Sequence, residues 1–222
     1  MTRIYPNGKD HRGSSDSSKS TSNYNPILAW SMGCQLTSLN FQTHDTDLAV
    51  NDGLYRQTGG IGYVTKPQWL MGVGEKPSPI RLKIRVLSGN CIPKAFVGDK
   101  DTPITDDTSI DNPCVILELH DVIVHQDDQE KFQLSNHKVP CKNGNGFCPI
   151  FEDMGKQFVI ETPDVAMLVF RVEQDTEQGN ILATTAVPVS CLRRGYRSVQ
   201  LYDMDNTRQG RFASATLLVF VM

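Results

Sequence analysis

The stretch from Val165 to Asp175, "VAMLVFRVEQD", is one of seven β-rich runs between residue 80 and the end of the chain. β-Branched and aromatic residues favour strands, and the Asp, Asn, Gly and Pro clusters between the runs favour turns. The series predicts an antiparallel β-sandwich with Greek-key connections over residues 81–222. The other six runs are "IRLKIRVLSG" (80–89), "CVILELHDVIV" (114–124), "KQFVIET" (156–162), "ATTAVPV" (183–189), "RSVQLYD" (197–203) and "SATLLVFVM" (214–222).

The part of the chain before this region has a different character. Glycine, proline and charge in "GVGEKPSPI" (72–80) predict a linker, and the polar "KDHRGSSDSSKSTS" (9–22) predicts a disordered insert. Between them we expect a turn or short helix in "NPILAW" (25–30), a buried strand in "CQLTSLNF" (34–41), and a glycine-rich turn leading to a short strand in "GGIGYVTKP" (59–67). Residues 1–71 carry no complete pattern of their own, which indicates a piece of a larger domain.

Composition excludes several classes of protein. The chain has 222 residues, 39% of them apolar, and a formal net charge of -3. It is long enough to bury a core, and its charge argues against a nucleic-acid partner. The sequence has no apolar run of about 18 residues and no secretory signal, so we expect any membrane contact to be peripheral.

Cysteine and histidine give weak signals. The six cysteines, at positions 34, 91, 114, 141, 148 and 191, are widely spread, and the spacing of Cys141 and Cys148 fits no compact zinc site. We therefore predict free thiols in a reducing compartment. A metal site at His120 and His125 with Asp127 and Asp128 is an alternative with less support.

Five collinear motifs carry a resemblance to a known family: "RIYPNG" (3–8), "SNYNPILAW" (22–30), "GCQLTSLNFQT" (33–43), "NDGLYRQTGGIGYVTKPQWL" (51–70) and "LKIRVLSGNCIPK" (82–94). Their order resembles the end of the catalytic barrel of eukaryotic phosphoinositide-specific phospholipases C, followed by their C2 domain. The resemblance implies a partial TIM-barrel (α/β) segment at 1–71, the end of the Y-box. It also implies a linker at 72–80 and an all-β C2 sandwich at 81–222.

The resemblance also implies an activity for the complete protein. The family hydrolyses phosphatidylinositol 4,5-bisphosphate to inositol 1,4,5-trisphosphate and diacylglycerol in signalling, at the cytosolic face of the membrane. That chemistry needs a base, an acid and a cation. In the family, paired histidines and a calcium ion supply these from an X-box that this chain lacks. We therefore expect the chain alone to be inactive, and Met1 to be an internal methionine or the start of an incomplete gene model.

Substrate recognition is the part of the site that the chain can contribute. Arg3 matches the family arginine that binds a ring phosphate, and Tyr5 matches the tyrosine whose ring stacks on the inositol. A guanidinium forks onto phosphate oxygens, which suits the first role. Without the resemblance, both would be ordinary strand residues.

Calcium binding by the C2 region is an open question in the sequence. Asn112 and Gln174 stand where the resemblance leads us to expect acidic residues, so a calcium site would depend on Asp111 and Asp175, with Asp106 and Asp107 as possible compensation. A solvated acidic loop is the simpler interpretation.

Two further functions remain as alternatives: a non-catalytic C2 lipid-binding module and an inactive phospholipase-like regulator. Other conspicuous side chains are predicted to be structural. We expect hydrogen-bonded amides at Asn40, Gln42 and Asn51, a solvated Lys66, and packing of Trp30 and Trp69 on turns of the barrel.

Overall fold

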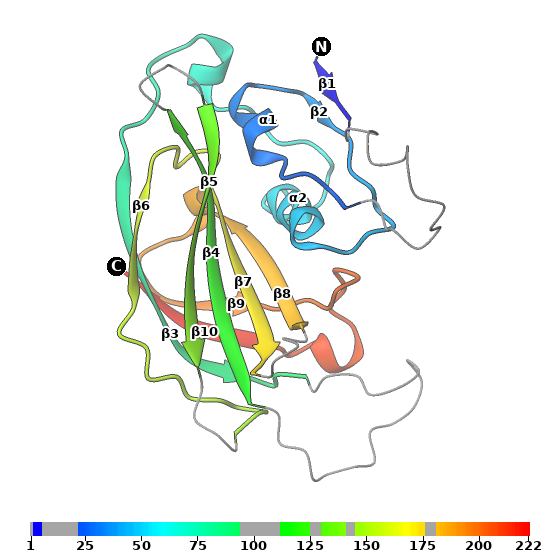
Figure 1. The fold of residues 1–222 in the computed structure, drawn as a ribbon, viewed down its shortest axis with the longest axis vertical. Coiled ribbons are helices and arrows are strands. Elements are labelled where there is room, and N and C mark those ends of the chain that lie inside the picture. Colours follow the sequence, from blue (N-terminus) through cyan, green and yellow to red (C-terminus); the bar gives the residue numbers. More distant parts are fainter. Residues whose placement is uncertain (1, 6–21, 94–111, 125–129, 141–144, 176–180) are drawn as a thin grey trace, which may run out of the picture.

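The computed structural model describes residues 2–5, 22–93, 112–124, 130–140, 145–175 and 181–222. Two four-stranded antiparallel sheets pack face to face as a sandwich (Figure 1). One sheet has the order β6 (Lys156–Ile160), β3 (Ile80–Asn90), β10 (Thr216–Val221) and β9 (Gly195–Gln200). The other has the order β5 (Glu130–Pro140), β4 (Pro113–Val124), β7 (Met167–Gln174) and β8 (Ile181–Pro188).

A smaller segment precedes the sandwich and covers one of its sheets. It contains β1 (Arg3–Ile4), α1 (Ile27–Ser31), β2 (Leu36–Thr37), α2 (Thr46–Arg56) and the 3-10 turn η2 (Gln68–Met71). β1 and β2 pair in parallel, and both helices lie over the outer face of the β5-β4-β7-β8 sheet (Figure 1). Two further 3-10 turns, η3 (Val189–Cys191) and η4 (Gly210–Phe212), flank β9.

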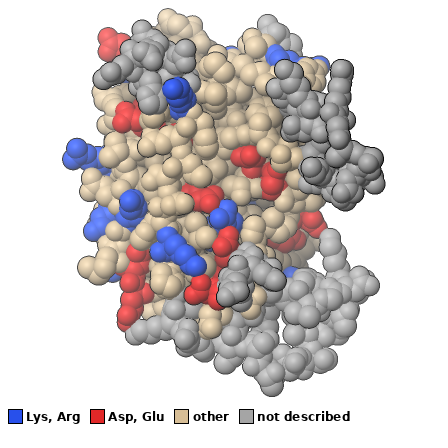
Figure 2. Space-filling model, in the orientation of Figure 1, with Lys and Arg blue, Asp and Glu red and all other residues tan. Residues whose placement is uncertain are grey.

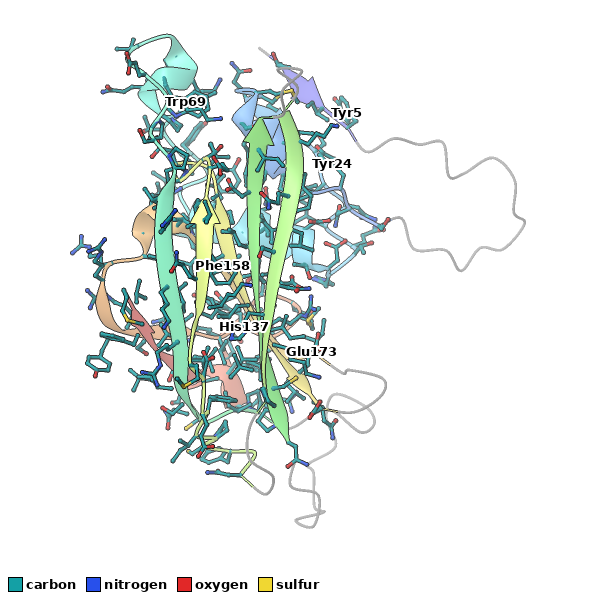
Figure 3. The ribbon with its side chains drawn as sticks, turned by 60° about the vertical axis from the view of Figure 1, so that its left-hand side comes forward. Tyr5, Tyr24, Trp69, His137, Phe158 and Glu173 are labelled. Carbon is teal, nitrogen blue, oxygen red and sulfur yellow. The ribbon has the colours of Figure 1, made fainter. Side chains whose placement is uncertain are left out.

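Strand β7 shows how the molecule builds two apolar layers. Successive side chains of a strand point to opposite faces. Leu168 and Phe170 belong to the core between the two sheets, whereas Met167 and Val169 belong to a second cluster on the outer face, where they join Ile27 of α1. The long run "MLVF" is therefore buried on both sides, as expected for a strand covered by layers on both faces. Phe158 on β6 fills the core between the sheets from the opposite side (Figure 3).

The antiparallel sandwich predicted for the second half is confirmed, with all seven predicted runs containing strands. An eighth strand, β5, was missed, because its sequence "EKFQLSNHKVP" is mostly polar. β5 is an edge strand that pairs with β4 along its length, and its described residues are largely exposed, so apolar patterning gives little sign of it.

In the first half, the helix predicted in "NPILAW" is confirmed, but both predicted strands are largely wrong. Only Leu36–Thr37 pairs as a strand within 34–41, because the Asn40 side chain then accepts from the Gln42 backbone N–H at 3.0 Å and turns the chain. No strand forms in residues 59–67, where Gly59, Gly60 and Gly62 have positive φ angles. The insert predicted at 9–22 lies outside the described residues except at Ser22.

Helix α2 was also missed. Asp45 caps its N-terminus by accepting from the Leu48 N–H at 2.9 Å, and the N–H groups of Gly59 and Gly60 close its C-terminus. Gly53 lowers the helix propensity, but it allows α2 to approach β8: a Cβ at Gly53 would lie 2.4 Å from the carbonyl oxygen of Ala186. The helix is thus stabilised by its packing on the sheet.

Candidate functional site

Of the two predicted substrate residues, Arg3 lies on β1 and Tyr5 directly follows it, at the edge of the N-terminal segment. The backbone of β1 is held by β2, since the Leu36 N–H donates to the Thr2 carbonyl at 3.2 Å and the Ser38 N–H donates to the Ile4 carbonyl at 2.9 Å. Arg3 and Tyr5 are two residues apart, and their side chains lie on the same side of the chain. This pairing explains why an exposed terminal strand has a defined conformation.

Arg3 and Tyr5 contact each other directly. The Arg3 Nη1 donates to the Tyr5 hydroxyl at 2.7 Å, and the guanidinium carbon lies 5.6 Å from the centre of the Tyr5 ring. The Tyr5 side chain is more than half exposed, at 59% (Figure 3). The pair thus presents a guanidinium next to an open aromatic face, which are groups that can bind a phosphate and cover the apolar side of a sugar ring.

Tyr24 supports this strand from below and was not singled out in the sequence. Its hydroxyl donates to the Ile4 carbonyl at 3.4 Å, in the same corner of the molecule as Tyr5 (Figure 3). Burial, followed by the nearby Cys34, raises the pKa of Tyr24. Tyr24 therefore stays protonated and donates throughout the physiological pH range.

The loop beside this corner is built by amides, as predicted for Asn40. The buried Asn23 donates to the Asn40 and Thr43 carbonyls and also to the Asp45 carboxylate. Asn40 in turn donates to the Thr43 hydroxyl at 3.0 Å. Asn51 is buried and donates to Asp52 at 3.4 Å. These contacts assign Asn40 and Asn51 to the structure of the loop and the helix.

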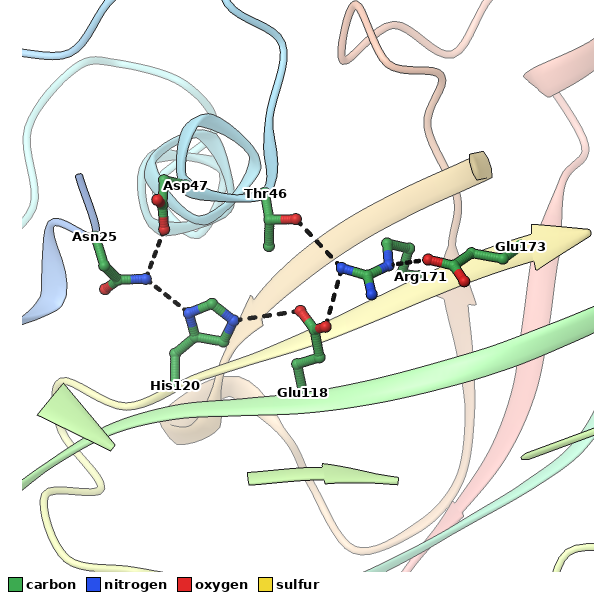
Figure 4. Close-up of polar contacts among 7 residues, drawn as sticks. All are labelled: Asn25, Thr46, Asp47, Glu118, His120, Arg171 and Glu173. Carbon is green, nitrogen blue, oxygen red and sulfur yellow. Dashed lines mark hydrogen bonds and ion pairs between the residues drawn. The ribbon is translucent and has the colours of Figure 1, made fainter. Parts of the chain in front are cut away.

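A chain of polar contacts connects the segment to the sandwich (Figure 4). We call it the junction network, and it consists of Asn25, Thr46, Asp47, Glu118, His120, Arg171 and Glu173. Asn25 Nδ2 lies 2.7 Å from both Asp47 Oδ1 and His120 Nδ1, and His120 Nε2 lies 3.5 Å from Glu118 Oε2. Since the amide nitrogen donates, His120 Nδ1 accepts, which leaves its proton on Nε2 facing Glu118.

Arg171 completes the junction network on β7. Its Nη1 lies 2.9 Å from Glu118 Oε1, its Nε donates to Glu173 at 2.5 Å, and Nη1 also reaches the Thr46 hydroxyl at 3.5 Å. Burial alone would raise the pKa of Glu118, but the His120 hydrogen bond and the Arg171 charge outweigh it and lower that pKa. Glu118 is thus a buried carboxylate held ionised between two partners.

Three predictions on side chains of the N-terminal segment have mixed outcomes. Lys66 is not simply solvated, because its ammonium donates to the Gly33 carbonyl. Trp30 and Trp69 pack against the outer apolar cluster of the β5-β4-β7-β8 sheet, and Trp69 Nε1 also donates to Asp164 at 3.2 Å. Both tryptophans thus join the segment to the sandwich, a partner that the sequence did not indicate.

The described residues provide little for a metal ion. Among them, no three His, Cys, Asp or Glu side chains lie close enough together to hold one. Asp175 is ion-paired with Lys138 at 2.9 Å, and His120 belongs to the junction network. Other predicted ligands, Asp106, Asp107, Asp111, His125, Asp127 and Asp128, lie outside the described residues.

The predicted free thiols are found at the five cysteines that the structure describes, of which Cys148 and Cys191 are exposed. Cys141 lies outside this part of the chain. The described helices include none that is long and apolar enough to cross a bilayer.

Comparison with known proteins gives a consistent set of relatives. Residues 1–69 match the family model for the Y domain of phosphatidylinositol-specific phospholipase C. The 1-phosphatidylinositol 4,5-bisphosphate phosphodiesterase delta-4 of Xenopus laevis is 33% identical over 94% of this chain and 26% of its own length. The delta-1 enzyme of Rattus norvegicus is 32% identical over 99% of this chain and 27% of its own length.

A solved structure extends this similarity to the fold. The crystal structure of S. officinalis PLC21 superposes with a TM-score of 0.63 at 23% identity, over 90% of this chain and 24% of that one. The chain thus spans about a quarter of the length of the curated relatives it matches.

Proposed function

This chain matches phosphoinositide-specific phospholipases C along nearly its whole length, and on that premise we propose that it is the C-terminal portion of such an enzyme. The complete protein hydrolyses phosphatidylinositol 4,5-bisphosphate to inositol 1,4,5-trisphosphate and diacylglycerol. The observation that carries the proposal is the alignment of 99% of the chain with an enzyme named for this phosphodiesterase reaction.

The role of this chain in that reaction is substrate recognition by Arg3 and Tyr5. Their direct contact and their exposure suit a guanidinium that binds a ring phosphate and a ring that covers the inositol. The catalytic base and acid come from residues outside this chain, so the chain alone releases no inositol phosphate.

The domain organisation follows the same proposal. Residues 1–71 form the end of the barrel's Y-box, 72–80 a linker, and 81–222 a C2 domain that docks on the cytosolic face of membranes containing phosphoinositides. The parallel pairing of β1 with β2 supports a barrel origin, because TIM barrels are built from parallel strands. The contacts of the segment with the sandwich show that the two parts pack together in this chain.

A chimera tests the substrate role. We would replace the matching quarter of the Rattus norvegicus delta-1 enzyme with this chain and measure release of inositol trisphosphate from vesicles. Arg3→Gln should reduce turnover by about tenfold or more, since a hydrogen bond to a charged group contributes about 1.5–3 kcal/mol. The matched control is Arg81→Gln, which removes an exposed arginine on β3. A folded chimera whose activity is unaffected by Arg3→Gln would refute the assigned role.

Calcium is expected for the complete enzyme, with most of its ligands outside this chain. A weak additional site in the C2 loops would use Asp111 and Asp175. The Asp175 N–H donates to the Asn112 carbonyl at 2.8 Å, which brings Asp175 next to the chain that follows Asp111. The Asp175 carboxylate, however, is occupied by Lys138.

Thermal unfolding of the isolated chain tests this additional site. Millimolar calcium should raise the melting temperature if the site exists, because a ligand that binds only the folded state stabilises it. The rise should be larger in Lys138→Gln, which frees the carboxylate, and lost in Asp175→Asn. The proposal fails if calcium has no effect on either the original chain or Lys138→Gln.

A further inference from the structure

A pocket that the function above does not use lies where the C-terminus of α2 meets the sandwich. Its cavity measures about 340 Å³ and lies among α2, β8, η3 and β9. This volume is at the lower end of the roughly 300–1,000 Å³ that is typical of small-molecule sites. The pocket belongs to a different part of the chain from Arg3 and Tyr5, so it stands independently of the proposed function.

The wall of the pocket combines apolar and basic groups. Ala186, Val187 and Leu192 provide apolar surface, and three arginines, Arg56, Arg193 and Arg197, also line it. The described lining includes no aspartate or glutamate. Charges on the face shown in Figure 2 are instead interspersed, with blue and red side chains next to each other. The charged side chains in the described lining of the pocket are thus all positive.

Arg56 is the most constrained of the three arginines. Its Nη1 donates to Asn206, its guanidinium carbon lies 4.0 Å from the centre of the Tyr202 ring, and its Nη2 is buried with no hydrogen-bond acceptor in the described structure. Burial, as the largest effect, lowers the pKa of Arg56. The charges of Tyr202 and Asp52 act in the opposite direction, and Asn206 links Arg56 to Asp52. The buried Nη2 is still without an acceptor, and an anion in the pocket would supply one.

Of the other two arginines, Arg193 lies in the loop before β9 and Arg197 lies on β9 itself. Arg197 donates to the backbone carbonyls of Arg193, Arg194 and Tyr196, which fixes the loop and keeps an exposed guanidinium at the pocket. Arg193 is exposed and lines the pocket. The Arg193 guanidinium can turn toward a ligand without breaking a hydrogen bond or ion pair of the described structure.

We propose that this pocket binds a phosphate group attached to a short apolar moiety, as in the head region of an anionic phospholipid. The three arginines supply the positive charge that a phosphate requires, and the apolar wall accommodates the attached group. A ligand without charge would form no ion pair with the arginines, and a bare anion would leave the apolar wall solvated.

Isothermal titration calorimetry of the full 222-residue chain tests the proposal with three probes. Two are lipids used below their critical micelle concentrations, dihexanoyl phosphatidic acid and dihexanoyl phosphatidylcholine, and the third is inorganic phosphate. We expect phosphatidic acid to bind at least tenfold more tightly than either of the other two. Equal affinity for inorganic phosphate would assign the pocket to a free anion and overturn the lipid assignment, and no binding of phosphatidic acid would overturn the site itself.

Variants locate the binding. Arg193→Gln should weaken the binding of phosphatidic acid by about tenfold, the effect of losing one charge-assisted hydrogen bond. The control is Lys131→Gln, which removes an exposed charge on β5, at the edge of the sheet opposite β8. Equal loss in both variants would show nonspecific charge attraction and refute the pocket.

A second measurement does not depend on any substitution. The exposed Cys191 lines the pocket and lies 3.8 Å from Gln57 Oε1, whereas the exposed Cys148 lies elsewhere. Bound phosphatidic acid should slow alkylation of Cys191 severalfold and leave Cys148 unchanged, as read by peptide mass spectrometry. Unchanged alkylation of Cys191 at saturating ligand would contradict the proposal.

Discussion

The two sheets of the sandwich differ in what covers their outer faces. In the β6-β3-β10-β9 sheet, the pattern of β10 alternates, with Leu217 and Val219 buried and Leu218 partly exposed at 39%. In the β5-β4-β7-β8 sheet, the residues Met167–Phe170 of β7 are all buried. The alternating sheet faces solvent, and the continuously buried sheet carries the N-terminal segment.

The burial pattern of a strand thus shows whether a second layer covers the outer face of its sheet. The outer face of β4 carries the buried polar side chains Glu118 and His120. His120 contacts Asn25, which precedes α1, and Glu118 is paired with His120 and with Arg171 of β7. The inner face of the sheet packs mainly through apolar side chains, whereas the outer face mixes an apolar cluster with the junction network. The sandwich core thus depends mainly on burial, and the attachment of the segment depends on both burial and polar pairing.

Two substitutions on β7 test whether the layers are separate, and they have the largest expected effects. Phe170→Ala removes a ring from the inner core and should lower the free energy of unfolding by about 3–5 kcal/mol. Met167→Ala opens the outer cluster and should cost about 2–5 kcal/mol, confined mainly to the segment.

Hydrogen exchange measured by mass spectrometry distinguishes the two layers. Phe170→Ala should raise exchange in both sheets. Met167→Ala should raise it in α1 and α2 while β3 and β10 keep their protection, because regions open with different free energies. If Met167→Ala raised exchange in β3 and β10 as much as in α1 and α2, the segment and the sandwich would unfold as one unit.

A smaller effect on stability is expected from a substitution in the junction network, which provides the polar contacts between the segment and the sandwich. Glu118→Gln should lower the free energy of unfolding at pH 7 by about 1–3 kcal/mol, the cost of disturbing a buried hydrogen-bonded charge. Because the pKa of Glu118 is lowered in the folded chain, its contribution is complete above its ordinary value of 4.5 and is lost as the pH falls through the folded value. The difference between variant and original should therefore shrink in acid.

Urea unfolding at pH 7 and at pH 3.5 measures this difference. Glu75→Gln, which neutralises an exposed carboxylate, is the matched control and should have little effect at either pH. A Glu118→Gln deficit that stays constant down to pH 3.5 would contradict the assigned pairing.

How much of the fold the sequence predicts depends on where the stabilising partners lie. Strands such as β3 and β4 follow from their own apolar residues. β5 does not, because its pairing with β4 stabilises a polar edge strand. α2 contains Asn51 and Gly53, which favour other conformations, and it forms because it packs on β8. The local sequence pattern therefore does not predict an element whose formation depends on tertiary contacts.

Whether a candidate site can be predicted from the sequence also depends on how far apart its residues lie in the chain. Arg3 and Tyr5 could be named from a motif, and their mutual contact agrees with a shared role. The arginine pocket could not be predicted, because Arg56 and Arg193 lie far apart in the chain and meet only through the docking of α2 on β8. The same holds for Glu118 and Arg171, whose pairing requires the register of β4 with β7.

The close contact of Gly53 with Ala186 also bears on the order in which α2 and β8 fold. Helix α2 is synthesised before β8, its main partner, and a helix of 11 residues is only marginally stable alone. The main contacts of α2 with its sheet can therefore form only after β8 has left the ribosome.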